Sequence, residues 1–246
     1  LLYKNTGMTE QFNSDFVEGV KKILNVFTTE QDHAQSPYLF ERDTWRQEDT
    51  LVEAGKGTPV GKTGMTWSGF RPSDDACQYG YLVPSNMFAV VILGYIQEIF
   101  SDVLEDATIV AIAKKLQEEI EEGIQTFGRT KNQNNETIYA YEVDGLGNAS
   151  VMDDSNVPNL VAAPYLGYCS TEDEQYLTTR QTLLSKENPY FYEGKYAKGI
   201  GSSHTPENYV WPIALAMEGM TTKDKAEKER ILDLLVATDA VSYTHL

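Results

Sequence analysis

Cysteine and histidine are scarce in this chain of 246 residues, which contains two of the former and three of the latter. Cys77 and Cys169 lie far apart, which excludes a disulfide scaffold and a cysteine-rich zinc site and favours a reducing compartment, with the cytoplasm as the expected location. His33 and His204 do not have metal-binding spacing, and the acidic residues do not follow an EF-hand register. No metal site is therefore expected.

Positive charge is also in short supply. The chain has 20 Lys and Arg residues against 37 Asp and Glu residues, so its formal net charge is −17. An acidic surface repels phosphate backbones, and no basic stripe reverses the charge locally, so a nucleic-acid partner is excluded. Long apolar runs are missing as well. No window approaches the roughly 18 to 20 apolar residues that cross a bilayer, and no membrane partner is expected.

Apolar residues at helical spacing dominate what remains. The pattern predicts helices over about 10–28, 88–99, 109–127, 171–185, 208–219 and 223–238. Thr171 and Glu174 form a capping box that is expected to open the fourth of these helices. No linker rich in Pro, Gly or Ser divides the chain. The sequence therefore predicts a single domain of mainly α class.

Two segments depart from the helical pattern. The stretch from about 30 to 75 is irregular and rich in polar, aromatic and glycine residues. Residues 138–143 alternate between apolar and polar side chains and meet the Asp144-Gly145 pair, which predicts a short β-hairpin. We therefore expect one small β element beside the helices.

The two ends do not resemble those of a complete protein. Residues 1–7 resemble the end of a helix running into its glycine cap, so a preceding helix is expected to be missing. Residues 241–246 resemble translated sequencing adapter. We therefore expect a domain that comprises 1–240, followed by a non-native tail at 241–246.

Loops dense in Trp, Tyr, Arg, Asp and Asn are the most informative segments for function. Aromatic rings stack on sugar rings, and carboxylates and amides bind sugar hydroxyls. Hydrolysis of a glycosidic bond needs two carboxyl groups, one of them an acid. Asp74 and Asp75 supply adjacent carboxyl groups before the second helix. The sequence alone leaves two interpretations of equal weight, in which this pair either takes part in catalysis or caps the helix that follows.

Long runs of the sequence resemble glycoside hydrolase family 125. The run at 63–77 (TGMTWSGFRPSDDAC) is the most specific, and the resemblance covers essentially residues 1–240. The other matching runs are 79–88, 139–145, 152–158, 164–168 and 200–205. The resemblance implies a partial (α/α)6 barrel, here with a small β-hairpin. It also implies a fragment of an inverting exo-α-1,6-mannosidase that uses no metal or cofactor and trims mannose from N-glycan-type oligosaccharides.

The resemblance also implies roles for particular residues. It makes Asp74 the general acid, with Asp75 as the alternative, and the acid must hold its proton near neutral pH. Inversion needs a second carboxylate roughly 6.5–9.5 Å away. In the family this base is a Glu in a His-Glu-Ser motif, whose place is taken here by 241–246. An earlier Trp-Leu-Arg-Asp motif is also missing, so this chain is expected to lack its base and to be inactive.

Six further residues are implied as substrate-binding candidates by their positions in the matching runs. They are Trp67, Arg71, Asp144, Asp154, Asn156 and His204. Core packing of Trp67 against Phe70 is an equally weighted alternative. Two rival functions stay open, namely a carbohydrate-binding remnant without turnover and a related helical-toroid glycosidase with a different linkage preference.

Overall fold

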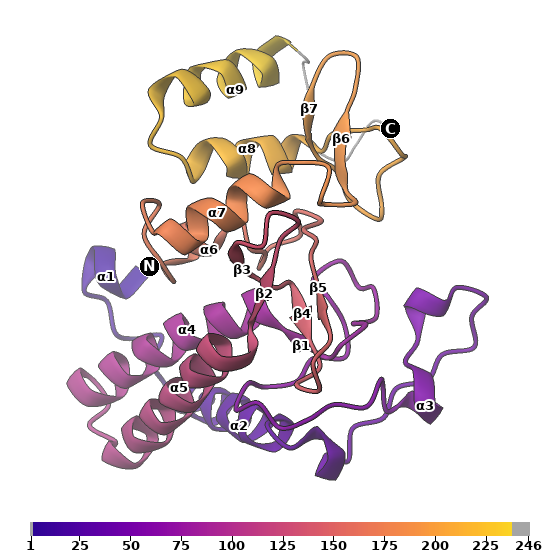
Figure 1. Ribbon diagram of the computed structural model, residues 1–246. Coiled ribbons are helices and arrows are strands. Elements are labelled where there is room, and N and C mark those ends of the chain that lie inside the picture. Colours follow the sequence, from indigo (N-terminus) through magenta and orange to yellow (C-terminus); the bar gives the residue numbers. More distant parts are fainter. Residues whose placement is uncertain (1, 238–246) are drawn as a thin grey trace.

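The computed structural model describes residues 2–237 and is mainly helical with small sheets, as the sequence predicts (Figure 1). The helices are α1 (Leu2–Thr6), α2 (Ser14–Glu30), α3 (Val52–Gly55), α4 (Val83–Asp102), α5 (Ala107–Phe127), α6 (Ala163–Leu166), α7 (Glu174–Leu183), α8 (Pro212–Met220) and α9 (Lys225–Ala237). In Figure 1, α2, α4 and α5 occupy one end, α7, α8 and α9 the other, and the strands lie mostly between them. The predicted tail at 241–246 lies outside the described residues.

The core is built around the antiparallel pair α4 and α5. Helix α5 begins where Asp106 accepts hydrogen bonds from the backbone N–H groups of Thr108 and Ile109, a favourable N-cap. Its apolar residues at helical spacing, such as Leu116 and Ile120, are buried as the periodicity requires. Helix α4 starts at residue 83, five residues before the first apolar position that marked it in the sequence.

Helix α4 corrects one prediction from the sequence. Over 20 residues it is long and apolar enough to cross a bilayer by length and composition, whereas no such window was expected. The helix packs against α5 in the core, where Leu93 and Phe100 are fully buried. Its apolar character therefore matches burial inside the protein fold.

The remaining helices start close to their expected positions. Asn13 caps α2 by accepting from the N–H groups of Asp15 and Phe16. Gly7, at φ +72°, ends α1 as expected, because a left-handed residue is favourable after a helix. Helix α7 begins three residues later than predicted.

The predicted capping box of α7 is wrong. Its N-cap is Asp173, whose carboxylate accepts from the N–H of Tyr176 at 2.8 Å. Aspartate caps helices as well as Thr does, so the residue nearest the true start takes the role that was assigned to Thr171. An acidic residue, Glu174, still stands in the first turn.

The β structure is more divided than predicted. The strands are β1 (Tyr81–Leu82), β2 (Arg129–Lys131), β3 (Thr137–Tyr139), β4 (Glu142–Val143), β5 (Ala149–Ser150), β6 (Phe191–Glu193) and β7 (Lys198–Ile200). Strands β4 and β5 form the predicted hairpin, but Ile138 and Tyr139 belong to β3, which pairs with β2. Ala140 and Tyr141 separate β3 from β4. The N–H of Ala140 still bonds to the carbonyl of Gly128, next to β2. The β6–β7 hairpin was not predicted.

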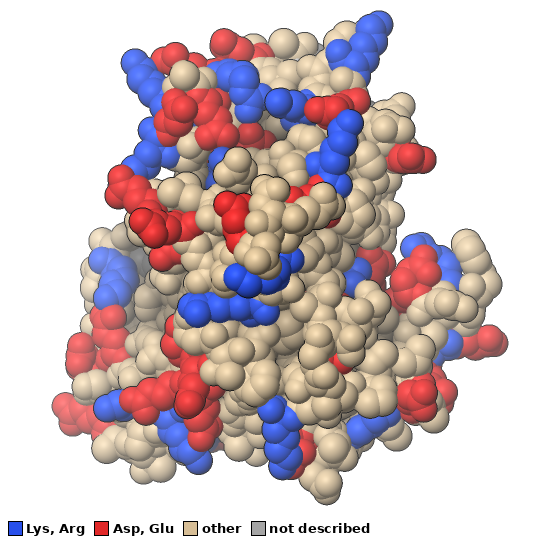
Figure 2. Space-filling view, in the orientation of Figure 1, with Lys and Arg blue, Asp and Glu red and all other residues tan. Residues whose placement is uncertain are grey.

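Strand β4 is the central strand of a three-stranded sheet, ordered β1–β4–β5. The segment from about 31 to 80 is largely irregular, as expected, and it wraps past this sheet with α3 at its outer edge (Figure 1). On the face shown in Figure 2, Lys and Arg side chains lie among Asp and Glu side chains. This sheet and the loops around it carry the candidate site.

Candidate active site

A tight loop presents Asp74 at its tip. Phe70 and Ala76 form an isolated β-bridge at its base, the N–H of Arg71 donates to the carbonyl of Asp75 at 2.8 Å, and the N–H of Asp74 donates to the carbonyl of Arg71 at 3.0 Å. Asp74 has φ +67° and is exposed. Outside glycine this left-handed conformation is uncommon, though Asp tolerates it, and such backbone strain concentrates at functional sites.

The helix-capping alternative for Asp74 and Asp75 is wrong. The helix that follows them, α4, begins at Val83, and its N-cap residue Leu82 makes no side-chain capping bond. Two strand residues and a loop separate the acidic pair from the helix. Both carboxylates therefore have other roles, which the geometry of the loop helps to distinguish.

Asp75 is buried and its oxygens are occupied. One oxygen accepts hydrogen bonds from the hydroxyls of Ser73, at 3.1 Å, and Ser203. Its other oxygen lies 3.5 Å from Nε2 of His204. The same Nε2 donates to the carbonyl of Ser73 at 2.8 Å, so this nitrogen carries the hydrogen. The 202–204 turn thus holds Asp75 in place, whereas Asp74 is exposed at the loop tip.

Arg71 is anchored to a residue that the sequence did not single out. Its Nε donates to Glu142 at 2.5 Å, and Glu142 is completely buried at the centre of the three-stranded sheet. Burial lowers the pKa of Arg71, but the hydrogen bond and charge of Glu142 outweigh it, so the pKa is raised and the guanidinium stays charged. The same guanidinium lies over the ring of Tyr141 at 5.8 Å.

Asp154 and Asn156 approach this cluster from the loop after β5. The hydroxyl of Tyr141 donates to Asp154 at 3.3 Å, and the amide of Asn156 donates to Ser202 at 3.3 Å. Asp154 is fully buried, and among the described residues its second oxygen has no hydrogen-bond partner. An unsatisfied buried carboxylate oxygen is costly, so its presence in a fold calls for a specific explanation, such as a functional role.

Asp153, beside it, is equally buried. Burial, together with the neighbouring charge of Asp154, raises its pKa to about 7, against hydrogen bonds from the backbone N–H groups of Ser155 and Val161 that lower it. Two adjacent buried carboxylates thus differ in their partners, since Asp153 holds the loop and Asp154 faces Tyr141. Tyr141 links the two groups, since its hydroxyl donates to Asp154 and its ring lies under the Arg71 guanidinium.

Tyr190 is a further residue of this cluster that the sequence analysis missed. Burial raises the pKa of Tyr190, the charge of Arg71 lowers it, and the charges of Asp154 and Asp75 raise it, so Tyr190 lies within electrostatic reach of all three. The aromatic run 190–192 was the available signal. The structure therefore brings together Arg71, Asp75, Asp154, Asn156 and His204, with Asp74 at the tip of the adjoining loop.

Two of the predicted binding residues, Asp144 and Trp67, make side-chain contacts within the fold. Asp144 accepts hydrogen bonds from the N–H groups of Leu146 and Asn148 and from the Asn148 amide, so it closes the β4–β5 turn. Trp67 is buried and stacks on His33 at 3.4 Å, with the rings 8° from parallel. Phe70, its expected partner, packs edge-on against Phe40.

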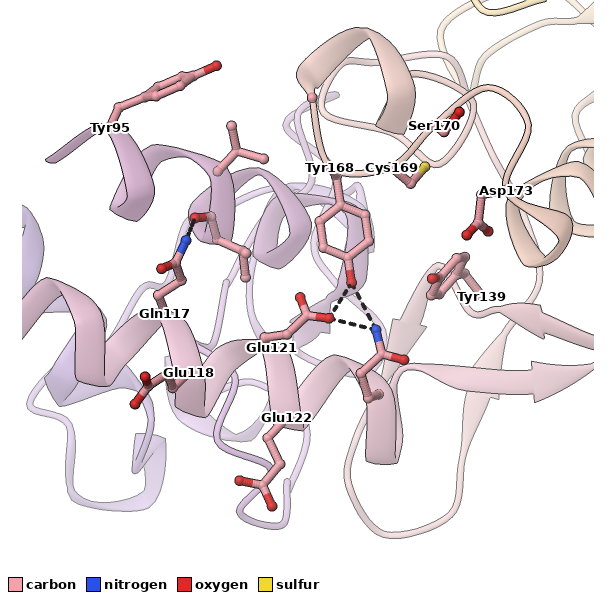
Figure 3. Close-up of a pocket in the computed structure, with 14 residues that line it drawn as sticks. Tyr95, Gln117, Glu118, Glu121, Glu122, Tyr139, Tyr168, Cys169, Ser170 and Asp173 are labelled. Atoms are coloured by element: carbon pink, nitrogen blue, oxygen red, sulfur yellow. Dashed lines mark hydrogen bonds between the residues drawn. The ribbon is translucent and has the colours of Figure 1, made fainter. Parts of the chain in front are cut away.

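A separate pocket of about 880 Å³ lies elsewhere, between α4, α5 and the turn after α6 (Figure 3). Tyr168 donates to Glu121 at 3.3 Å and accepts from Gln125 at 3.2 Å on its wall. None of the residues predicted for the site lines it. Within residues 2–237, no group of three or more His, Cys, Asp or Glu side chains is placed to hold a metal ion.

Comparisons with known proteins show which family the chain belongs to. The family model for metal-independent alpha-mannosidases (GH125) matches residues 1–245. The chain belongs to GH125. It is similar to a Streptococcus pneumoniae metal-independent alpha-mannosidase, solved in a non-productive complex with alpha-1,6-mannobiose, with 62% identity and a TM-score of 0.94. This match covers 97% of the present GH125 chain and 56% of the bacterial one.

A eukaryotic protein is also similar to this GH125 chain. The meiotically up-regulated gene 157 protein of Schizosaccharomyces pombe is 38% identical over 200 residues, which are 80% of this chain and 39% of that protein. The GH125 chain therefore spans well under two thirds of the length of either relative.

Proposed function

We propose that this chain carries the general-acid half of an inverting exo-α-1,6-mannosidase that releases terminal mannose from N-glycan-type oligosaccharides. Three findings support the proposal: membership of GH125, similarity to a protein bound to alpha-1,6-mannobiose, and the convergence of charged groups around the 70–76 loop. The proposal depends most on the convergence of charged groups around this loop. The helices then form part of an (α/α)6 barrel whose loops at one end make the sugar site.

Asp74 is the residue we assign as the general acid. The Asp75 oxygens are engaged with Ser73, Ser203 and His204, whereas Asp74 is exposed at the loop tip and free to approach a glycosidic oxygen. Protonation of that oxygen lets the mannose leave with oxocarbenium-ion character. Asp75 connects the loop that carries the acid to the 202–204 turn.

Arg71, Asp154, Asn156 and His204 are proposed to hold the terminal sugar or to orient the acid. The unpartnered oxygen of Asp154 suits a sugar hydroxyl, which would supply its missing donor. An inverting reaction also needs a carboxylate base across the ring, roughly 6.5–9.5 Å from the acid. By resemblance to the family this is the Glu of a His-Glu-Ser motif, which the present sequence does not contain.

The test is hydrolysis of α-1,6-mannobiose by the protein as its gene encodes it, followed by ¹H NMR. Inversion predicts that β-mannose appears first. Asp74→Asn should lower kcat on the order of 10²- to 10⁴-fold, because it removes the proton donor. Asp102→Asn, an exposed change at the end of α4, is the matched control and should leave kcat unchanged.

Other outcomes distinguish the rival functions. Binding of mannobiose without any release supports a carbohydrate-binding protein. Release from other linkages in preference to α-1,6 supports a related glycosidase of different specificity. Full activity in Asp74→Asn together with its loss in Asp75→Asn transfers the acid role to Asp75.

A further inference from the structure

Glu142 lies beside the 70–76 loop, which carries Asp74 and is called the acid loop below. It lies on the central strand β4, paired with Leu82 of β1 on one side and Ser150 of β5 on the other. Its backbone N–H also bonds to the hydroxyl of Ser150 at 3.1 Å. The side chain is fully buried, so a charged carboxylate there is stable only if donors satisfy it.

The two carboxylate oxygens of Glu142 bind opposite ends of the acid loop. One oxygen accepts from Nε of Arg71, at the start of the loop, at 2.5 Å. The other accepts from the backbone N–H groups of Gln78 and Tyr79, after the loop, at 2.9 and 3.2 Å. A single side chain on a rigid strand therefore fixes both ends of the segment that contains Asp74.

The backbone of Arg71 passes this restraint on to Asp74. The carbonyl of Arg71 accepts from the N–H of Asp74, and its N–H donates to the carbonyl of Asp75. Any shift of Arg71 thus moves the loop tip. Displacement of a reacting group by about 1 Å is enough to reduce a rate by around 10²-fold.

We propose that Glu142 is a positioning residue that sets the place of the general acid through Arg71 and through the backbone at 78–79. The inference rests on the proposed function, since it concerns the same acid. Glu142 does not contact substrate in this proposal. It acts indirectly, as a fixed hydrogen-bond acceptor for groups on both sides of the acid loop.

A Gln at position 142 has nearly the same shape but only one acceptor oxygen. It therefore satisfies either Arg71 or the two N–H groups, and one end of the loop is released. The informative measurement is how the loss of kcat depends on the leaving group of the substrate. Hydrolysis of α-1,6-mannobiose needs proton donation to a poor leaving group, whereas 2,4-dinitrophenyl α-mannoside has a good leaving group that departs without a proton.

We expect Glu142→Gln to lower kcat on α-1,6-mannobiose on the order of 10- to 100-fold, with KM within about twofold. The loss of kcat on the dinitrophenyl mannoside should stay within about threefold, because the acid is not needed there. Arg71→Lys, which keeps the charge but loses the planar donor geometry, should show the same selective loss. It serves as the second variant if Glu142→Gln does not fold.

Glu218→Gln is the matched control, because Glu218 is also buried and also paired with an arginine, Arg230, at 2.9 Å. It should affect the two substrates equally. An equal loss on both substrates in Glu142→Gln and Arg71→Lys overturns the positioning role but leaves the proposed function standing. Failure of the protein as its gene encodes it, without any substitution, to cleave either substrate overturns the proposed function, and the positioning role with it.

Discussion

Two acidic regions of this molecule differ in how their carboxylates are held. Around the 70–76 loop, buried Asp75 and Glu142 receive donors from segments that are far apart in the sequence, and buried Asp154 accepts from Tyr141. In the pocket of Figure 3, Glu118 and Glu122 are exposed, and Glu121 bonds mainly to its own helix and to Tyr168. The carboxylates of the Figure 3 pocket therefore have the weaker network.

This difference teaches that, of these two regions, buried charge gathers around the 70–76 loop and not in the open pocket. Burying a carboxylate is costly, so a fold keeps one only where donors are built around it or where a ligand completes it. The glutamates of the Figure 3 pocket are exposed or half-buried, so the fold does not bear a comparable cost there. Three predictions test this contrast, from the largest effect to the smallest.

Asp153 should make stability depend strongly on pH. Burial, helped by the charge of Asp154, raises its pKa from an ordinary value of 3.8 to about 7. Its stabilising contribution is present below pH 4 and is lost as pH rises through 7, because the unfolded chain releases the proton more readily. The loss amounts to about 4 kcal/mol, and urea unfolding at pH 4, 5.5, 7 and 8 measures it.

Asp153→Asn cannot titrate and provides the comparison. The difference in unfolding free energy between the unmodified protein and this variant should shrink as pH rises. A difference that stays constant from pH 4 to 8 would show that Asp153 is ionised throughout. Burial would then not decide its proton affinity.

Asp144→Ala should cost about 1–3 kcal/mol of stability, since it leaves the donors of the β4–β5 turn unpaired. Burial opposes ionisation of Asp144, but hydrogen bonds from Asn148 and Leu146 outweigh it, and its pKa is lowered. The contribution of Asp144 should therefore be lost as pH falls below about 3.8. Asn148→Ala removes only part of the set and should cost less in the same denaturation assay.

Glu121→Gln, in the pocket of Figure 3, should change the free energy of unfolding by less than about 0.5 kcal/mol, because Glu121 is only half-buried. Its kcat on α-1,6-mannobiose should equal that of the unmodified protein. A clear fall in kcat would break the comparison, since it would give the pocket a part in the reaction.

Local patterns in the sequence predicted the helices well. The apolar spacing of α2, α4 and α5 is a property of each segment alone, so it is readable without the fold. The strands were harder to predict, because β1 and β4 are two residues long and exist only through pairing across about 60 residues of chain. The β6–β7 hairpin has a loop at 194–197 and not the two-residue Asn-Gly or Asp-Gly turn that is the strongest hairpin signal in sequence.

The site was only partly predictable for a related reason. Asp74 and Asp75 are adjacent and look alike in sequence, but one has a left-handed backbone and the other is buried against Ser203. Glu142 could not be told from other strand carboxylates in the sequence, because its hydrogen bond to Arg71, 71 residues earlier, exists only in the folded protein. Motifs identify which residues gather at a site, while the division of labour among them depends on contacts that only the fold creates.

The long reach of these contacts has a consequence for biosynthesis. The bond between Ser203 and Asp75 joins residues 128 positions apart. At roughly 5–20 residues per second, the ribosome needs on the order of ten seconds to make the intervening chain. Throughout that time the acid loop exists without the turn that holds Asp75, so helices such as α4 and α5 can pair well before the loop acquires its final shape.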